Sequence, residues 1–369
     1  MLIDFDTSAA WTVENMQTDT GWIYYLSDSQ ARHMVDVIRE NYSPDRSFFE
    51  YAPDDFDLGS GFHTIISAAK QAYFGRGVTL VKGLPSSELN EIEYRILTWV
   101  IGLHLGVPRP QGRMTQYISE VQAAGGIYRH AGGRGYNTNS NLDFHADGCD
   151  LVALACFNAA KAGGMSMVSS SILAWQTLLE ERPDLAEVAL SDFHFSRNQE
   201  QAPDEGAFYA QPLFDVEDGR LFAKWNRNRI NTAQQLDGVP RLSEAQIECI
   251  DLLDDILRRP GAMFSMWLEP GDLQFINNHI VLHSRTEFED YQEKDKKRLL
   301  YRLWLAPPFS VKLPDSWCDF FRSTQPGVVR GGIRGHNHND TCKEFERNQA
   351  RHLGMKYIPN GVGILSNQS

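Results

Sequence analysis

A histidine and an aspartate stand two positions apart in the segment Asn-Leu-Asp-Phe-His-Ala-Asp-Gly, as His145 and Asp147. On an extended strand, positions i and i+2 project to the same face, so both side chains can grip one metal ion. Imidazole and carboxylate without a thiolate suit iron(II) better than a structural zinc. The tripeptide alone is a weak signal, because a histidine at a strand end is often satisfied by a polar neighbour.

A second segment, Glu-Pro-Gly-Asp-Leu-Gln-Phe-Ile-Asn-Asn-His-Ile-Val-Leu-His-Ser-Arg, supplies two further candidate ligands. Its turn at 269–272 starts an apolar strand, which we expect to end in His279 and His283. One histidine from this distant strand would complete a triad of two histidines and one carboxylate on one face of the metal. Such a triad leaves three coordination positions open for a cosubstrate and O₂. The residues by themselves leave both histidines as candidates.

Two arginines lie in the hydrophobic run Arg-Leu-Leu-Tyr-Arg-Leu-Trp-Leu-Ala-Pro, as Arg298 and Arg302. A guanidinium inside an apolar strand is costly unless it meets an anion, and its fork matches a carboxylate. Arg298 also ends the charge run Lys-Asp-Lys-Lys-Arg, so a solvent-facing position is an equal alternative.

The composition places limits on the class of protein. The chain has 369 residues, of which 42% are hydrophobic and 22% charged, an ordinary globular balance. Its net charge of −13 argues against nucleic acid or an anionic membrane as a partner. The five cysteines are scattered without a CxxC pair, and no apolar stretch approaches the roughly 20 residues of a membrane span. The first residues are acidic and do not resemble a signal peptide. We therefore expect a reduced, cytoplasmic protein.

Short strands with tight turns, interrupted by helices, must position these residues. The pattern predicts helices at 30–41, 62–74, 88–104, 172–192 and 243–258. It predicts strands at 77–83, 151–157 and 166–171, then AMFSMWL, LQFINN and the run at 298–307. Residues 108–140 are rich in glycine and asparagine and are expected to form a loop, a candidate lid. This order indicates a β-sandwich or jelly roll with helices packed outside.

Four motifs in order, HADG, AGGMSMVSS, PGDLQFINNHIVLH and RLLYRLWLAP, resemble the taurine dioxygenase (TauD/TfdA-like) branch of the clavaminate synthase-like iron(II)/2-oxoglutarate oxygenases. The resemblance covers about residues 75–310. It implies a mainly β fold with α, a double-stranded β-helix (jelly roll, cupin-like) core flanked by helices. The chain is then expected to be a single domain over 1–369. Its parts are an N-terminal helical elaboration (1–75), the jelly-roll core (76–310) and a C-terminal extension (311–369).

The resemblance also implies roles for individual residues. His145, Asp147 and His283 match the metal ligands, and Arg298 matches the arginine that pairs with the distal carboxylate of 2-oxoglutarate. Ser166 stands where the family usually has a threonine whose hydroxyl contacts the same carboxylate, and it keeps a hydroxyl donor.

Two further positions bear on the match to the family. Arg302 matches an arginine that in several members reaches the cosubstrate or the acidic group of the substrate. The family's Asp-Asn-Arg before the distal ligand reads Asn277-Asn278-His279 here. In that motif the ligand follows the arginine position by four residues, which favours His283 over His279.

The implied activity is that of an iron(II) dioxygenase using 2-oxoglutarate and O₂ and releasing succinate and CO₂. Halogenating relatives lack the carboxylate that Asp147 supplies, so hydroxylation, desaturation or oxidative cyclisation is expected. Arg302 suggests a small carboxylate-bearing substrate, an amino acid or related compound of secondary metabolism. The loop Lys-Trp-Asn-Arg-Asn-Arg-Ile, with Trp225, Asn226, Arg227 and Arg229, either lines the same pocket or is an ordinary polar loop.

The alternative is a metal-binding β-sandwich without oxygenase activity, either a zinc hydrolase or a binding module. No HExxH or GxSxG motif supports a hydrolase. The sequence leaves oligomerisation open.

Overall fold

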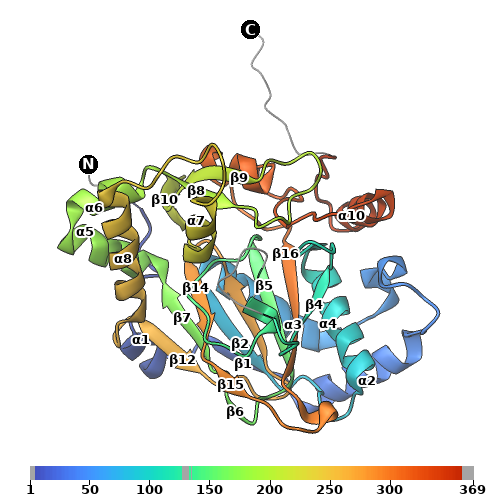
Figure 1. The fold of residues 1–369 in the computed structure, drawn as a ribbon. Coiled ribbons are helices and arrows are strands. Elements are labelled where there is room, and N and C mark those ends of the chain that lie inside the picture. The colour runs from blue at the N-terminus through green and yellow to red at the C-terminus, as the bar shows by residue number, and fades with distance from the viewer. Residues whose placement is uncertain (1–4, 127–132, 134, 360–369) are drawn as a thin grey trace.

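Two sheets form the centre of the molecule, which the computed structural model describes over residues 5–126, 133 and 135–359 (Figure 1). The larger sheet has seven strands in the order β1-β2-β13-β5-β16-β3, with β4 also beside β16. Its strands are β1 (Ile23–Tyr25), β2 (Val78–Lys82), β3 (Val107–Arg109), β4 (Ile118–Val121), β5 (Leu151–Asn158), β13 (Leu273–Asn277) and β16 (Leu299–Ala306). The smaller sheet has the order β12-β7-β14, with β7 (Ser166–Ser170), β12 (Met263–Met266) and β14 (Val281–Arg285).

The two sheets face each other across an apolar layer. One cluster of buried side chains joins Val152 and Leu300 of the larger sheet to Val168 and Val281 of the smaller sheet. The three short remaining sheets are antiparallel pairs: β6 (Ala162–Gly163) with β15 (Phe288–Glu289), β8 (Asp192–Ser196) with β9 (Phe208–Pro212), and β10 (Phe214–Glu217) with β11 (Arg220–Ala223). This arrangement is the expected jelly-roll core.

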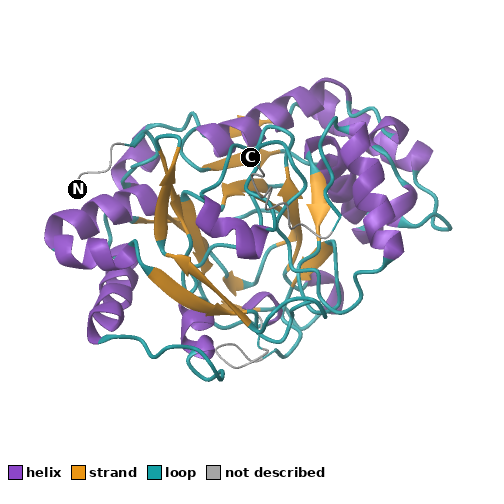
Figure 2. Cartoon of the chain, turned by 90° about the horizontal axis from the view of Figure 1, so that it is seen from above, coloured by secondary structure: helices purple, strands orange, loops and turns teal. Residues whose placement is uncertain are grey.

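Helices cover the outer face of each sheet (Figures 1 and 2). The larger sheet is covered by α2 (Asp28–Asn41), α3 (Gly59–Phe74) and α4 (Glu91–Leu105), and the smaller sheet by α5 (Ser171–Glu181), α6 (Pro183–Ala189) and α8 (Glu244–Arg258). The remaining helices are α1 (Val13–Thr18), α7 (Arg227–Ala233), α9 (Cys318–Phe321) and α10 (Asp340–His352). Within the part of the chain that is described, no helix has the length and apolar character to cross a membrane.

The helix predictions are confirmed, and one predicted helical segment is divided into two helices. The patterns at 30–41, 62–74, 88–104 and 243–258 correspond to α2, α3, α4 and α8, and Ser243 caps α8 as its sequence indicates. Residues 172–192 form two helices, because Pro183 starts α6 and cannot continue the backbone hydrogen bonds of α5.

The segment 108–140 is not wholly a loop. Its first part contributes β4, and β3 begins just before it; both strands pair antiparallel with β16. These strands are too short for a clear alternation of apolar and polar residues. The glycine-rich stretch that includes His130, the candidate lid, lies mostly outside the described residues.

Candidate active site

Backbone pairing places the candidate metal ligands side by side. The backbone amides of His145 and His283 each donate to the other's carbonyl oxygen at 3.0 Å, so His145 pairs with β14. On its other side His145 bridges to Asn226, which follows β11. Only His145 of this segment is paired as a strand residue, and Asp147 lies beyond the pairing. The expected extended strand is therefore a single bridging residue, which suffices to bring His145 and His283 together.

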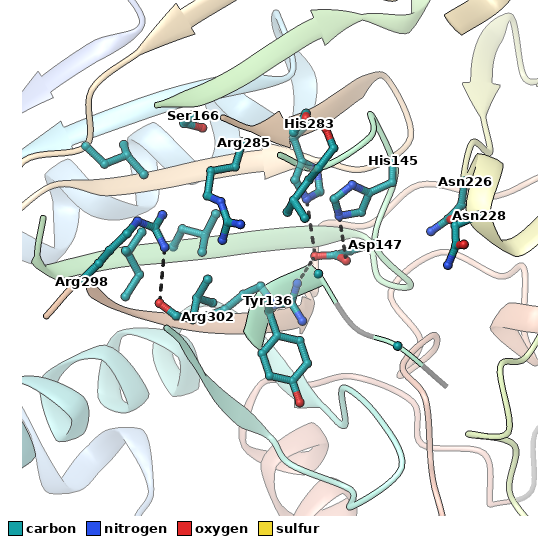
Figure 3. Close-up of a pocket in the computed structure, with 18 of the residues that line it drawn as sticks. Tyr136, His145, Asp147, Ser166, Asn226, Asn228, His283, Arg285, Arg298 and Arg302 are labelled. Atoms are coloured by element: carbon teal, nitrogen blue, oxygen red, sulfur yellow. Dashed lines mark hydrogen bonds and ion pairs between the residues drawn. The ribbon is translucent and has the colours of Figure 1, made fainter. Parts of the chain in front are cut away.

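His145, Asp147 and His283 form a compact cluster, and one candidate ligand atom from each lies within 4.8 Å of the others. His145 Nε2 is 3.9 Å from Asp147 Oδ1, and His283 Nε2 is 3.7 Å from Asp147 Oδ2. Figure 3 shows the three side chains converging on one point. Two imidazole nitrogens and a carboxylate without a thiolate are a donor set that fits iron(II).

The surroundings of the cluster favour the protonation states that a metal needs. Burial, together with the neighbouring His283, lowers the pKa of His145 to about 4, so its ring is neutral near pH 7. His145 Nδ1 lies 2.9 Å from the Asp143 carbonyl oxygen, which leaves Nε2 directed at the cluster. Burial alone raises the pKa of Asp147, but the adjacent Arg302 and histidines lower it well below its usual range.

His279 does not belong to this cluster. It lies in the turn after β13, and its Nε2 is 3.0 Å from Asp150 Oδ1. Arg330 pairs with the same carboxylate at 2.6 Å. The expectation that one strand ends in both histidines is wrong, because β13 ends at Asn277 and the turn separates His279 from the strand that carries His283.

A cavity of about 930 Å³ extends from this cluster between the two sheets. Arg298 lies toward one end of it, away from the three candidate ligands (Figure 3). The side chain is buried, with 5% of the residue exposed, which excludes the solvent-facing alternative. No carboxylate among the described residues pairs with its guanidinium, which donates only to the Val121 carbonyl oxygen at 3.4 Å. Burial lowers the pKa of Arg298 to about 10.

Ser166 lines the same cavity from β7, and its hydroxyl donates to Gln274 Oε1 at 3.1 Å. Arg285 of β14 also lines it, between the candidate ligands and Arg298 (Figure 3). Arg285 is not among the residues predicted from the sequence. It stands two positions after His283, and side chains two apart on a strand share a face, so this spacing is a signal that could have identified it.

Arg302 of β16 lines the cavity, but its guanidinium already has partners. It donates to Asp147 Oδ2 at 3.0 Å and to Gln111 Oε1 at 2.9 Å. Trp304 Nε1 donates to the same Asp147 oxygen at 2.9 Å. These contacts fix the orientation of the carboxylate.

The side chains of the segment after β11 face in two directions, some into the cavity and one toward α8. Asn226 and Arg229 line the cavity, together with Asn228, which the sequence analysis did not single out. Arg227 faces away and pairs with Asp251 and Asp254 of α8.

His338 lies in the loop before α10, where it is half-buried, and its Nε2 lies 3.2 Å from Glu346.

Comparison with known proteins gives consistent matches. The family model "Taurine catabolism dioxygenase TauD, TfdA family" matches residues 46–304. FR-33289 synthase of Streptomyces rubellomurinus is 26% identical over 312 residues, which cover 84% of this chain and 92% of that protein. Uridine-5'-phosphate dioxygenase of Amycolatopsis sp. is 27% identical over 180 residues, covering 47% of this chain and 63% of that protein.

Among solved structures, asparagine oxygenase in complex with Fe(II), 3-hydroxyasparagine and succinate has a TM-score of 0.58 at 16% identity. The match covers 77% of this chain and 93% of that one, and it shows that the fold is shared. None of these proteins supports the alternative of a zinc hydrolase or a binding module. The chain belongs to the taurine catabolism dioxygenase (TauD/TfdA) family and is an iron(II)- and 2-oxoglutarate-dependent dioxygenase.

Proposed function

We propose that His145, Asp147 and His283 hold the iron(II) and that Arg298 and Ser166 hold the distal carboxylate of 2-oxoglutarate. The observation that carries this proposal is Arg298, a buried cation that faces the cavity without a carboxylate partner among the described residues. A buried guanidinium without an anion is costly, and its planar fork matches a carboxylate in geometry and charge.

Iron(II) with 2-oxoglutarate and O₂ supplies the oxidation of a C–H bond, with release of succinate and CO₂. The chain's own residues provide placement and exclude water. Arg302 and Trp304 orient Asp147, and the Asp143 carbonyl oxygen orients the ring of His145. Apolar side chains form part of the wall of the cavity and keep competing water away from the cosubstrate; they are Val121, Leu142, Leu154, Leu268 and Leu300.

The proposed substrate is a small anionic metabolite, an amino acid or a related compound. Its support is the cationic lining of the cavity, together with the small molecules named for its relatives, such as uridine 5'-phosphate. The role of Arg302 in binding the substrate stays a prediction, since its guanidinium contacts Asp147 and Gln111 in this structure.

A single domain over 1–369 and a cytoplasmic location also remain our proposals. The first is supported by β1, which comes from the N-terminal segment and pairs with β2 of the main sheet. The second is supported by the five cysteines, all of which are free thiols, as expected in a reducing compartment.

An anaerobic titration tests the cosubstrate site. Iron(II) and 2-oxoglutarate added together are expected to give the visible charge-transfer band of a chelated 2-oxo acid. If the folded protein binds iron but shows no band at saturating 2-oxoglutarate, the proposal is wrong. Succinate release across a panel of amino acids and small acids then identifies the substrate.

A further inference from the structure

A second cavity, of about 540 Å³, adjoins the first beside the candidate metal ligands. Asp147, Asn226 and Arg229 line both cavities, so the two meet at the cluster. Asn226 and Asn228 lie on the opposite side of this cluster from Arg298 (Figure 3). The second cavity is therefore reached from the metal centre in the direction away from the proposed cosubstrate site.

Lys224 lines the second cavity and is almost fully buried, with 5% of the residue exposed. It directly follows β11, and its backbone amide donates to the Leu213 carbonyl oxygen. No described residue forms a hydrogen bond or an ion pair with its ammonium group, which lies 4.4 Å from the centre of the Phe320 ring. Burial lowers the pKa of Lys224 to about 8, so most of the side chain is still charged near pH 7.

Two arginines of the same cavity each keep an unused donor. Arg229 pairs with Glu200 at 2.7 Å through Nη2, while its buried Nη1 has no hydrogen-bond partner in the part of the chain that is described. Arg197 pairs with Asp319 at 2.7 Å through Nη2, and no described residue accepts a hydrogen bond from its buried Nε. Buried donors without acceptors are costly and rare in folded proteins.

The charges of this cavity do not cancel. Arg229 and Arg197 are each neutralised by one acid, and Glu205, the remaining acid of the lining apart from Asp147, pairs with Arg322 and Arg334 outside it. Lys224 is then a buried positive charge that no acid among the described residues pairs with. A cation in such a position is retained at a cost in stability, which a bound anion would offset.

We propose that Lys224, Arg229 and Arg197 bind a tetrahedral oxyanion of the substrate, a phosphate, phosphonate or sulfonate group, while the carbon to be oxidised lies at the metal centre. Three donors, two from the segment after β11 and one from the segment after β8, suit three terminal oxygens better than the two of a carboxylate. This inference rests on the proposed function, because it places the substrate between the second cavity and the proposed iron site. It also refines the expectation of a carboxylate-bearing substrate, since the charge of Arg302 is already matched by Asp147.

The test is a calorimetric titration of the anaerobic iron(II)–2-oxoglutarate protein with inorganic phosphate, sulfate and acetate. Phosphate and sulfate are expected to bind, the tighter of them indicating the kind of oxyanion, and acetate to bind about tenfold more weakly. The variant Lys224→Met should weaken phosphate binding by about tenfold or more. Arg227→Gln is the matched control, because Arg227 lies on the same helix as Arg229 but faces Asp251, and it should bind phosphate like the unaltered protein.

The inference would be overturned if neither phosphate nor sulfate binds, if acetate binds as tightly as either, or if Lys224→Met binds phosphate undiminished. If Lys224→Met does not fold, Arg229→Gln serves in its place with the same expectation. Phosphate bound to the iron instead would shift the charge-transfer band and persist in these variants, which also contradicts the inference. Failure of the proposed function is recognised separately, by the absence of the band before any phosphate is added.

Discussion

At the residue scale, the two buried arginines Arg298 and Arg302 line one cavity but differ in their partners. Arg298 is buried without a carboxylate partner among the described residues, whereas Arg302 is buried beside Asp147. Arg302 belongs to β16, and Arg298 directly precedes this strand. We propose that Arg298 pairs with a bound anion, whereas Arg302 pairs with Asp147, an anion of the protein itself.

Replacing Arg298 should separate cosubstrate binding from metal binding. Arg298→Gln is expected to raise the 2-oxoglutarate concentration for half-maximal charge-transfer absorbance by about tenfold or more, because a charge-assisted pair is lost. Arg298→Lys keeps the charge but not the fork, so a smaller increase is expected. Arg347→Gln, an exposed change on α10, is the control. Unaltered 2-oxoglutarate binding by Arg298→Gln would contradict the assignment.

Replacing Arg302 should distinguish its two candidate roles. Since Arg302 donates to Asp147, Arg302→Ala is expected to weaken iron(II) binding by about 10- to 100-fold, as measured by titration of the metal at saturating 2-oxoglutarate. If Arg302 only binds the substrate, iron affinity will stay the same and turnover alone will fall. Unchanged turnover together with unchanged iron affinity would eliminate both roles.

At the scale of elements, the turn between β13 and β14 is hydrogen-bonded to the segment that carries Asp147. Asn278 Oδ1 accepts a hydrogen bond from the Asp147 amide at 3.0 Å, and its Nδ2 donates to the Cys149 carbonyl oxygen at 3.2 Å. One side chain therefore ties the turn to the segment that carries two of the candidate ligands. Asn278 belongs to the triplet that departs from the family's motif, and this contact gives it a structural role.

Loss of the Asn278 side chain should lower the stability of the protein and weaken iron(II) binding. Asn278→Ala leaves buried polar groups without partners, which we expect to lower the free energy of unfolding by about 1–3 kcal/mol. It should also weaken iron(II) binding by about tenfold. Ser243→Ala removes the cap of α8, away from the site, and should cost about 1 kcal/mol with no change in iron affinity. Equal iron affinities in the two variants, measured by the same titration, would exclude a role for Asn278 in positioning Asp147.

At the scale of the whole molecule, buried ion pairs attach the C-terminal segment to the core. Arg330 pairs with Asp150, next to the start of β5, at 2.6 Å. Glu346 of α10 pairs with Arg109 of β3 at 2.8 Å and accepts a hydrogen bond from the Tyr117 hydroxyl at 2.6 Å. Residues after 310 are thus part of the packed structure around the site.

Glu346 should make the stability of the protein sensitive to acid. Burial by itself raises the pKa of Glu346, but Arg109, His338 and Tyr117 outweigh it and lower the pKa from 4.5 to about 2. A carboxyl with a lowered pKa stabilises the folded state fully above its unfolded value, and this contribution is lost as the pH falls from about 4.5 to about 2. The loss should be on the order of 3 kcal/mol.

The measurement is urea unfolding at a series of pH values. The free energy of unfolding should fall less steeply between pH 5 and pH 2 in Glu346→Gln than in the unaltered protein. Parallel curves would show that Glu346 does not titrate with the lowered pKa. If Glu346→Gln is not folded at pH 5, Tyr117→Phe removes one of the three stabilising partners and should give an intermediate slope.

The sequence by itself determined most of the helices, the jelly-roll class and the set of candidate ligands. Helical periodicity and capping residues are local signals, and α8 with Ser243 is a clear case. His145, Asp147 and Arg298 were selected because their types and order match a family pattern, and that pattern carries the geometry implicitly. The choice of His283 over His279 also followed from spacing, and the pairing of His279 with Asp150 agrees with it.

Only the tertiary structure shows which buried cationic side chains already pair with an acidic side chain. The sequence offered both Arg298 and Arg302 as partners for an incoming anion, and only the approach of Asp147 from a distant segment shows that Arg302 is already paired. Lys224 is likewise a single lysine in a short apolar run, and only the side chains around the second cavity show that no described acid pairs with it. Pairing of charges across long sequence separations leaves no local pattern, so it becomes visible only when the chain is folded.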